Sequence, residues 1–466
     1  MATNGHVETS EYDVIIVGAG LSGLTSAYTL LQKKPSAKVL VLEASDRYGG
    51  DVTSKDLNGA TGTCEWDIGG TRIGSSQKDI LALVKELGLE TTQIYNKGNK
   101  FWRLPDGKLK KFSGAIPPLP YTSLIDLVRY FKKVDGMQGQ IKMDQIMECK
   151  HAADWDGMNV KDFLKKYLWT QVGRETIETM THAFCAADQS SLSMMQYLYV
   201  IHTCGGWDLH TNSGDKGRSD LLIKGGAMLL CRKLVEKLGE GTVVLGETVK
   251  GIVEQDGGKM KVTTASGKDF CAERVIVAIP CSVSERITYD PPLRMRRSKT
   301  FPCRLDLMAS VITYKSPFWR EAGHAGEYLN MSATSRDDGG SINDALIISY
   351  DATLPDGNAA LMAFSNPQKV KGKSSEERKE IILRVLSEIF GPQIMDCIDY
   401  AEKEWLYDNS DGEMVNKSSE LLASVTTPHG RVHWAGADAG TAWCGLLTGA
   451  VQAGRRAAQE VIIATQ

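Results

Sequence analysis

The sequence predicts an α/β protein in which a doubly wound, parallel-sheet domain is joined to a second, α+β domain. One observation is the stretch Tyr12–Glu43, where an apolar run, glycines, a segment with helical periodicity and a second apolar run follow one another. This order is typical of a strand–turn–helix–strand unit around a buried parallel sheet. The second observation is that a strand, glycines and a helix start recur at residues 431–450.

The glycine-rich turn of the first unit has the spacing of a dinucleotide site. Gly18, Gly20 and Gly23 stand in the order G-x-G-x-x-G, directly after the predicted strand and at the start of the predicted helix. One glycine allows the tight turn, the next lets a pyrophosphate approach the backbone, and the third lets helix pack on strand. The helix N-terminus attracts the pyrophosphate, and Glu43 stands where a carboxylate accepts hydrogen bonds from ribose hydroxyls. The unit therefore predicts a Rossmann-like dinucleotide site, without deciding between FAD and NAD.

Composition narrows the class of protein. Of the 466 residues, 42% are hydrophobic and 24% charged, which is typical of a soluble globular chain that is long enough for two domains sharing one cofactor. The net charge of −3 argues against nucleic acid as the main partner. No apolar run is long enough for a membrane span, and the polar N-terminus leaves no room for a signal peptide, so a cytoplasmic protein is expected. Ten cysteines without metal-binding or C-x-x-C spacing predict reduced thiols and no metal site, with a single buried disulfide left open.

The middle of the chain predicts a second domain and further strands of the first. Ser76 is expected to cap a helix that Gly88 ends. A mainly helical lid or substrate-side wall follows, with helices expected over 123–134, 159–167 and 190–202. The meander of strands over 242–280 is common in FAD-binding folds and favours FAD over NAD. Further strands are expected over 304–314, 345–350 and 359–366, and a helix with a Ser374–Glu377 capping box over 374–391.

The motifs together resemble those of the flavin-containing monoamine oxidase family, in the family's order and spacing over nearly the whole chain. They are the N-terminal unit, Gly49-Gly50, Asp67-Ile68-Gly69-Gly70, Ala278-Ile279-Pro280, Tyr314-Lys315-Ser316-Pro317-Phe318-Trp319, Glu404-Trp405 and Trp434-Ala435-Gly436-Ala437-Asp438 with Gly449, Ala450 and Gly454. The resemblance implies an FAD-binding domain in three pieces (1–88, 215–290, 401–466). It also implies a substrate domain in two, mainly helical over 89–214 and sheet plus helix over 291–400. The membrane tail of the animal enzymes has no counterpart here, so a soluble member is expected.

The same resemblance implies which residues surround FAD. They are Gly18, Ala19, Gly20, Leu21, Ser22, Gly23, Glu43, Ala44, Arg47, Gly49, Gly50, Gly70, Thr71, Arg72, Val249, Gly436, Asp438, Leu446 and Leu447. The cysteine that attaches the flavin in the family has no counterpart around Met414, so FAD is expected to be held non-covalently. Asp51 stands where the family has an arginine at the pyrophosphate. Its charge would repel a diphosphate unless it turns away or pairs with Arg47 or another cation.

The expected substrate side departs from the family at several positions. Ala309 replaces a lysine that holds a water at the flavin N5. Met414 (or Val415) and Leu446 replace the two tyrosines of an aromatic cage. Arg72 has two interpretations of equal weight, a two-point contact with a substrate carboxylate or a phosphate or structural salt bridge. The catalytic residues therefore stay unknown, and the substrate-site candidates are Arg72, Ser219, Ala309, Trp405, Met414, Trp443 and Leu446, with His202 expected to be a structural histidine.

The resemblance implies an FAD-dependent amine oxidase-like oxidoreductase. The expected reaction is oxidation of a C–N bond in a small or medium organic amine, with the flavin as hydride acceptor and oxygen as oxidant. The expected partners are this small-molecule substrate and oxygen, and the sequence allows for a homodimer. Because the lysine and the cage are missing, a flavin-dependent isomerase, desaturase or oxidative cyclase on an apolar substrate is the alternative. A flavin-fold binding protein without turnover is a third hypothesis, motivated by Asp51.

Overall fold

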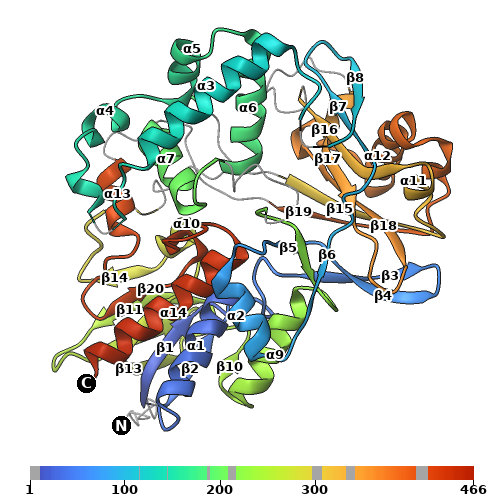
Figure 1. Cartoon of the computed structure of the whole chain (residues 1–466). Coiled ribbons are helices and arrows are strands. Elements are labelled where there is room, and N and C mark those ends of the chain that lie inside the picture. Colours follow the sequence, from blue (N-terminus) through green and yellow to red (C-terminus); the bar gives the residue numbers. More distant parts are fainter. Residues whose placement is uncertain are drawn as a thin grey trace.

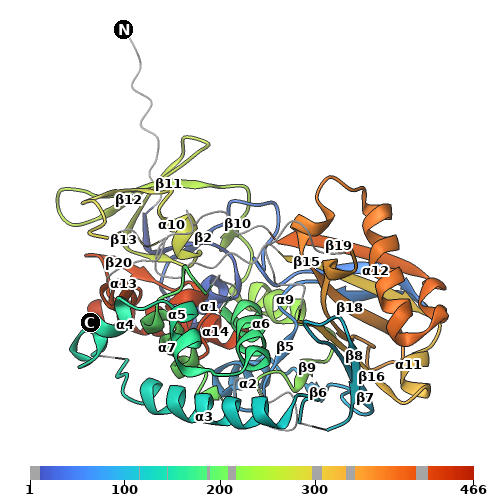
Figure 2. The same cartoon turned by 90° about the horizontal axis from the view of Figure 1, so that it is seen from above.

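The structure, a computed structural model, describes residues 11–114, 116–143, 145–185, 189–207, 217–295, 297, 307–331, 342–405 and 418–466. Figure 1 shows a sheet at the lower left beside helices α1 (Leu21–Lys33) and α14 (Leu447–Ala464), a helical region at the top and a second sheet at the right. In the view from above, the second sheet again stands apart at the right, whereas the helical region overlaps α1 and α14 (Figure 2). The predicted α/β class with a second, α+β part is confirmed.

The first sheet combines a parallel core with an antiparallel meander. Seven of its eight strands run in the order β10-β2-β1-β13-β12-β11-β14, and β20 pairs with β13. They are β1 (Glu11–Val17), β2 (Val39–Leu42), β10 (Val243–Val244), β11 (Val249–Glu254), β12 (Met260–Thr264), β13 (Asp269–Val277), β14 (Thr288–Asp290) and β20 (Val432–Trp434). The first half of β13 pairs antiparallel with β12, and its second half pairs parallel with β20. This strand therefore joins the meander to the parallel core.

Strand β1 is buried on both faces, which explains its continuous apolar run. Ile16 packs in a cluster with helices α1 and α14, whereas its neighbour Ile15 packs on the opposite side with residues of the meander. Both side chains are fully buried. Strand β1 pairs with β2 on one side and with β13 on the other, so its carboxyl end lies at a switch point of the sheet topology. Such a switch point is the usual ligand position of a doubly wound sheet.

The second sheet has seven strands in the order β19-β15-β18-β17-β16-β7-β8. They are β7 (Asn99–Arg103), β8 (Leu109–Phe112), β15 (Leu307–Tyr314), β16 (His324–Asn330), β17 (Leu346–Asp351), β18 (Ala359–Ser365) and β19 (Asp399–Trp405). Helix α12 (Ser375–Phe390) packs on one face through Ile382, Val385 and Leu386, and the predicted Ser374–Glu377 capping box is present. The other face packs against the hairpin β3 (Ser54–Gly59) and β4 (Gly62–Asp67).

The part of the chain that follows β8 is mainly helical, as predicted. Its helices are α3 (Tyr121–Gln138), α4 (Ala152–Asp156), α5 (Val160–Tyr167), α6 (Gln171–Cys185) and α7 (Met194–Thr203). The helix expected from residue 190 begins only at Met194, because Ser193 forms a capping box with Gln196. Similarly, Asn159 is the N-cap of α5 rather than its first residue.

The expected cap at Ser76 is wrong. Helix α2 (Lys78–Glu86) has Gln77 as its N-cap, without a side-chain bond, and the Ser76 hydroxyl is buried without a partner in the described part of the chain. The predicted end of this helix at Gly88 is confirmed, because Gly88 follows the C-cap and has a φ of 68°. The remaining elements are β5 (Arg72–Ile73), β6 (Thr91–Gln93), β9 (Leu221–Ile223), α9 (Met228–Leu238), α10 (Cys281–Ser284), α11 (Phe318–Glu321) and α13 (Ser418–Ser424).

The cysteines and the helices bear on two expectations drawn from composition, reduced thiols and the lack of a membrane span. All eight cysteines that lie in the described segments and have described side chains are free thiols, as predicted. Among the described helices, none combines the length and the apolar character that a membrane crossing requires.

Replacing Gly23 by alanine is expected to destabilise the fold, because the new Cβ would stand 2.0 Å from the Gly18 carbonyl oxygen. Backbone atoms cannot turn aside, so the free energy of unfolding should fall by about 3 kcal/mol or more. Thermal unfolding followed by circular dichroism measures the loss. The matched control is Gly20→Ala, whose Cβ would meet only the Gly50 Cα, at 4.0 Å. Equal stability of the two variants would contradict this packing.

Candidate cofactor and substrate site

Glu43 lies at the mouth of the first glycine turn. Its Oε2 accepts the Ala19 N–H at 2.8 Å, and its Oε1 accepts the Ser45 N–H at 2.9 Å and the Ser45 hydroxyl at 2.8 Å. These bonds fix the carboxylate beside the carboxyl end of β1. Each oxygen keeps further acceptor capacity, which ribose hydroxyls can use.

A second glycine turn faces the first. The Gly49 N–H donates to the Ala19 carbonyl at 2.8 Å, and Gly20 and Gly49 form a parallel bridge. A Cβ on Gly20 would touch nothing closer than the Gly50 Cα, so the space in front of this residue is open. Gly20 is also the N-cap of α1 and has no side chain to cover the first amides of the helix. Open space and uncapped N–H groups are what a pyrophosphate requires, so the residues fit a dinucleotide.

Arg47 and Asp51 take different positions around this second turn. The Arg47 guanidinium donates to the Gly50 carbonyl at 2.7 Å and so holds the backbone of the turn. The Asp51 side chain is exposed. The backbone carbonyl oxygen of Asp51 accepts the Gly70 N–H at 3.0 Å. Burial lowers the pKa of Lys403, a residue of β19, and the negative charge of Asp51 offsets part of this lowering. Lys403 is thus a further cation near Asp51, from the second sheet.

The C-terminal motif closes the same region. Helix α14 starts after Leu446 without a side-chain cap, and a Cβ on Gly70 would come within 2.8 Å of the Leu447 side chain. Asp438 Oδ2 accepts the Cys281 N–H at 2.6 Å, which ties this motif to the loop after β13. The structure therefore brings the first glycine turn, the Gly49-Gly50 turn and the start of α14 to one end of the first sheet. Of the other expected FAD contacts, Thr71 bonds the Gly69 carbonyl, Ala44 is exposed beside Glu43, and Val249 is buried at the start of β11.

One face of the second sheet is turned toward the first domain. In register across β19, β15 and β18, Lys403 lies opposite Ala309, and Ala309 lies opposite Phe364. Directly opposed residues of antiparallel strands share a face, so these three side chains form one row. Ala309 is fully buried and packs in a cluster with Ile68, which directly follows β4. The small Ala309 side chain is therefore enclosed by its neighbours, and the amine in the same row is that of Lys403.

Lys403 was not identified from the sequence as a site residue. Its Nζ lies 3.9 Å from the centroid of the Trp405 ring, and the Trp405 Nε1–H donates to the Ile68 carbonyl at 3.3 Å. Burial, with the nearby Arg47 and Lys55, lowers the pKa of Lys403 to about 8, and Asp51 offsets this only partly. The available signal was strand alternation in Glu402-Lys403-Glu404-Trp405, which puts the lysine on the same face as the tryptophan.

Arg72 lies between the two domains. Its guanidinium stacks on the Tyr350 ring, 3.5 Å from the centroid, and Nη2 donates to the Asp351 carbonyl at 3.4 Å. Burial lowers the pKa of Arg72, and its Nε is buried without a partner in the described residues. A stacking role is thus present in addition to the two roles considered from the sequence.

The other substrate-site candidates are placed as follows. Trp443 has a φ of 55°, a strained value for a residue other than glycine, and its N–H donates to the Thr203 carbonyl of α7 at 2.8 Å. Ser219 lies just before β9, which pairs with β5 so that Leu222 is opposite Arg72. Met414 and Val415 lie outside the described residues.

Two of the described histidines, His202 and His433, have polar partners within the fold. His202 Nδ1 lies 3.0 Å from the Gln138 carbonyl and 2.9 Å from its side-chain oxygen, and burial lowers the His202 pKa. His433 Nδ1 lies 2.9 Å from Glu460. These contacts agree with the structural role expected for His202. His210 and the side chain of His182 fall outside the described part.

Asp67 is a buried carboxylate directly behind the Gly69-Gly70 turn. Its Oδ2 accepts the Ala227 N–H at 2.8 Å, at the start of α9, while Oδ1 is buried without a partner in the described residues. Burial outweighs these amide bonds and raises the pKa of Asp67 to about 6. The carboxylate therefore positions the turn at a cost in stability near neutral pH.

Comparison with known proteins shows the family. A family profile described as flavin containing amine oxidoreductase matches residues 21–462. The chain belongs to this family. The flavin-containing amine oxidase A of Equus caballus is 30% identical over 97% of this chain and 85% of its own length. A probable flavin-containing monoamine oxidase A of Dictyostelium discoideum is 28% identical, with 97% of each chain covered.

Solved structures support the same assignment. A putrescine oxidase bound to putrescine has a TM-score of 0.84 at 26% identity, with 97% of this chain and 99% of that chain covered. The fold alone is supported by a cyclohexylamine oxidase of Brevibacterium oxydans, with a TM-score of 0.84, 24% identity and coverage of 97% and 99%. The amine oxidase member described here is thus an FAD-dependent oxidoreductase, as the motifs predicted. The comparisons do not favour the isomerase, desaturase or cyclase alternative.

The Asp67→Asn variant is expected to gain stability over the wild type as pH rises. The pKa of Asp67 is raised in the folded state from 3.8 to about 6, so the folded wild-type chain loses stability relative to the variant across this window. Across the whole window, the free energy of unfolding of the variant relative to the wild type should rise by roughly 3 kcal/mol. Asparagine keeps the acceptor for the Ala227 N–H. Thermal unfolding of both proteins between pH 4 and pH 7 measures the effect.

The matched control is Asp56→Asn, at an exposed position of β3. Its stability difference from the wild type should stay nearly constant over the same pH range. A constant difference for Asp67→Asn as well would show that the carboxylate is not held in a buried, disfavoured state.

Proposed function

We propose that this amine oxidase oxidises the C–N bond of a small or medium organic amine that binds as the neutral free base, with oxygen as the final oxidant. The observation that supports this is the row Lys403–Ala309–Phe364 on the second sheet, whose lysine lies near Arg47 and Asp51 at the second glycine turn. Bound FAD supplies the acceptor for a hydride equivalent from the substrate carbon. The chain's own residues hold, orient and desolvate the two reactants.

The row Lys403–Ala309–Phe364 and the stack of Arg72 on Tyr350 together form what we call the substrate wall. The charges of this wall support binding of a neutral amine. In the described part, Arg72 and Lys403 both bring positive charge to the face between the domains. Two cations repel a protonated ammonium, and more strongly a diamine that carries two. An uncharged amine with an apolar or aromatic body contacts Phe364 and Tyr350 without this cost. Putrescine, bound in one structural neighbour, is by this argument a poor substrate for the present chain.

The overall reaction balances without any further protein group. The amine loses two electrons and two protons and becomes an imine, which water hydrolyses to a carbonyl compound and ammonia or a smaller amine. Oxygen takes up the two electrons and two protons and leaves as hydrogen peroxide. Lys403, whose pKa is lowered to about 8, is the described group best placed to exchange a proton at this wall near neutral pH.

Several finer expectations belong to the same proposal. FAD is held non-covalently, since residues 406–417 contain no cysteine. The chain divides into cofactor-side segments 1–88, 215–290 and 401–466 and substrate-side segments 89–214 and 291–400, and β19 crosses the boundary at residue 400. The protein acts in the cytoplasm and assembles as a homodimer. The expected FAD residues and the substrate-site candidates keep the roles assigned from the sequence, with Lys403 added.

Anaerobic mixing of the purified, flavin-loaded protein with amines tests the proposal. An aromatic monoamine such as 2-phenylethylamine should bleach the flavin absorbance, with a rate that rises with pH as the free base becomes more abundant. Putrescine, a dication at neutral pH, should bleach it at least about tenfold more slowly, a difference of roughly 1.4 kcal/mol. Admission of oxygen should then release one hydrogen peroxide per amine consumed.

Two results would contradict different parts of this account. Bleaching by putrescine as fast as by the monoamine would overturn the neutral-amine preference and keep the oxidase activity. Product formation without oxygen uptake or peroxide would overturn oxygen as the oxidant.

A further inference from the structure

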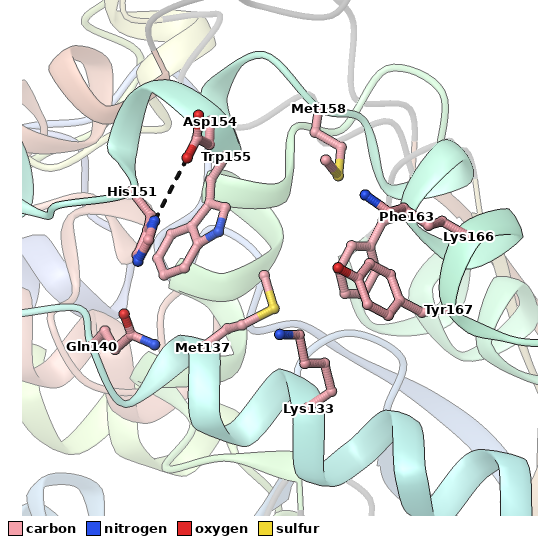
Figure 3. Close-up of a pocket in the computed structure, with 10 residues that line it drawn as sticks. All are labelled: Lys133, Met137, Gln140, His151, Asp154, Trp155, Met158, Phe163, Lys166 and Tyr167. Atoms are coloured by element: carbon pink, nitrogen blue, oxygen red, sulfur yellow. Dashed lines mark ion pairs between the residues drawn. The ribbon is translucent and has the colours of Figure 1, made fainter.

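The helical region carries a pocket on residues that the flavin site does not use. Its volume is about 410 Å³, within the range of small-molecule sites. Three segments line it: Lys133 and Met137 of α3 with Gln140 just beyond the end of that helix, His151, Trp155 and Met158 around α4, and Phe163, Lys166 and Tyr167 of α5. Figure 3 shows the side chains of these segments directed toward one opening.

Two aromatic pairs form the flanks of this pocket. The Phe163 and Tyr167 rings lie 4.4 Å apart with a tilt of 31°, and the His151 and Trp155 rings lie 5.5 Å apart with a tilt of 31°. In Figure 3 the two pairs stand on opposite sides, with the side chain of Met137 between them. Phe163, Trp155 and Met137 are buried, so the inner surface is apolar and rigid. Such walls favour a flat, aromatic body.

The rim of the pocket is positively charged. The ammonium groups of Lys133 and Lys166 each lie 5.6 Å from the centroid of the Tyr167 ring. Among the described residues, neither forms an ion pair with a carboxylate, whereas the adjacent Lys165 pairs with Asp162 at 3.8 Å. The lining carboxylate, Asp154, lies 3.6 Å from His151 Nδ1 on the other side. Two cations without an ion-pair partner at the rim of one apolar pocket favour an anionic ligand over a cationic one.

We propose that this pocket binds a small aromatic carboxylate, with its ring against the aromatic side chains and Met137 and its carboxylate at the rim that carries Lys133 and Lys166. The apolar lining supplies affinity by burial of the ring, and the two lysines supply charge selectivity. The lining side chains all lie between residues 133 and 167, whereas the expected cofactor turns follow β1, β2 and β4 and precede α14. The site is therefore an additional ligand site, separate from the substrate wall.

Calorimetric titration of the flavin-loaded full chain with 2-naphthoate tests this site. Saturable binding with a Kd of about 1 mM or tighter is expected, together with an unchanged flavin spectrum. The cationic analogue 2-naphthylmethylamine should bind at this site at least about tenfold more weakly, because the rim repels it. The double variant Lys133→Gln/Lys166→Gln should weaken naphthoate binding by at least about tenfold.

The matched control is Lys132→Gln/Lys165→Gln, which removes the same charge from the neighbouring positions outside the lining. This variant should bind 2-naphthoate within about twofold of the wild type, since distant surface charges are screened by salt. Equal weakening by the two double variants would overturn the site, because it would show binding through net charge alone. Absence of saturable binding up to about 10 mM 2-naphthoate would overturn it as well.

Discussion

The structure depends on the close approach of helix α1 to the end of strand β1. Gly23 stands so near to the Gly18 carbonyl that no side chain fits between them, and Ala278 after β13 closes the same contact. This packing fixes where α1 begins and leaves its first amides uncapped beside Glu43. At the other end of the chain, Gly454 of α14 packs equally closely on the Ser22 carbonyl. The glycine contacts thus set both helix N-termini on one end of the sheet, where we propose that the cofactor binds.

The second sheet completes this arrangement by facing the open end of the first. The row Lys403–Ala309–Phe364 and the stack of Arg72 on Tyr350 come from segments far apart in the sequence, yet they meet between the domains. The resulting wall is aromatic and positively charged. We propose that this wall desolvates the substrate and selects it by charge, while the oxidising power comes from the flavin. The family assignment and the geometry of the wall therefore describe complementary parts of one enzyme.

Local patterns made much of the fold predictable. The β1–α1–β2 unit and the Ser374 capping box follow from spacings within a few residues, and both are present. The start of α7 and the cap of α2 were mistaken, because several polar residues compete for the cap and tertiary packing decides among them. The role of Lys403 could not be predicted, since a lysine on a strand is usually solvated and only the register with Ala309 shows its neighbours. The left-handed backbone of Trp443 likewise has no sequence signal.

The central claim is that the glycine turn with Glu43 holds FAD. It is tested most directly by fluorescence titration of FAD into the deflavinated protein, comparing the wild type with Glu43→Gln and with Asp46→Asn as an exposed neighbouring control. Loss of the charged acceptor should weaken FAD binding by about tenfold to a hundredfold in Glu43→Gln, and the Asp46→Asn affinity should stay near that of the wild type. An unchanged affinity of the Glu43→Gln variant would contradict this account.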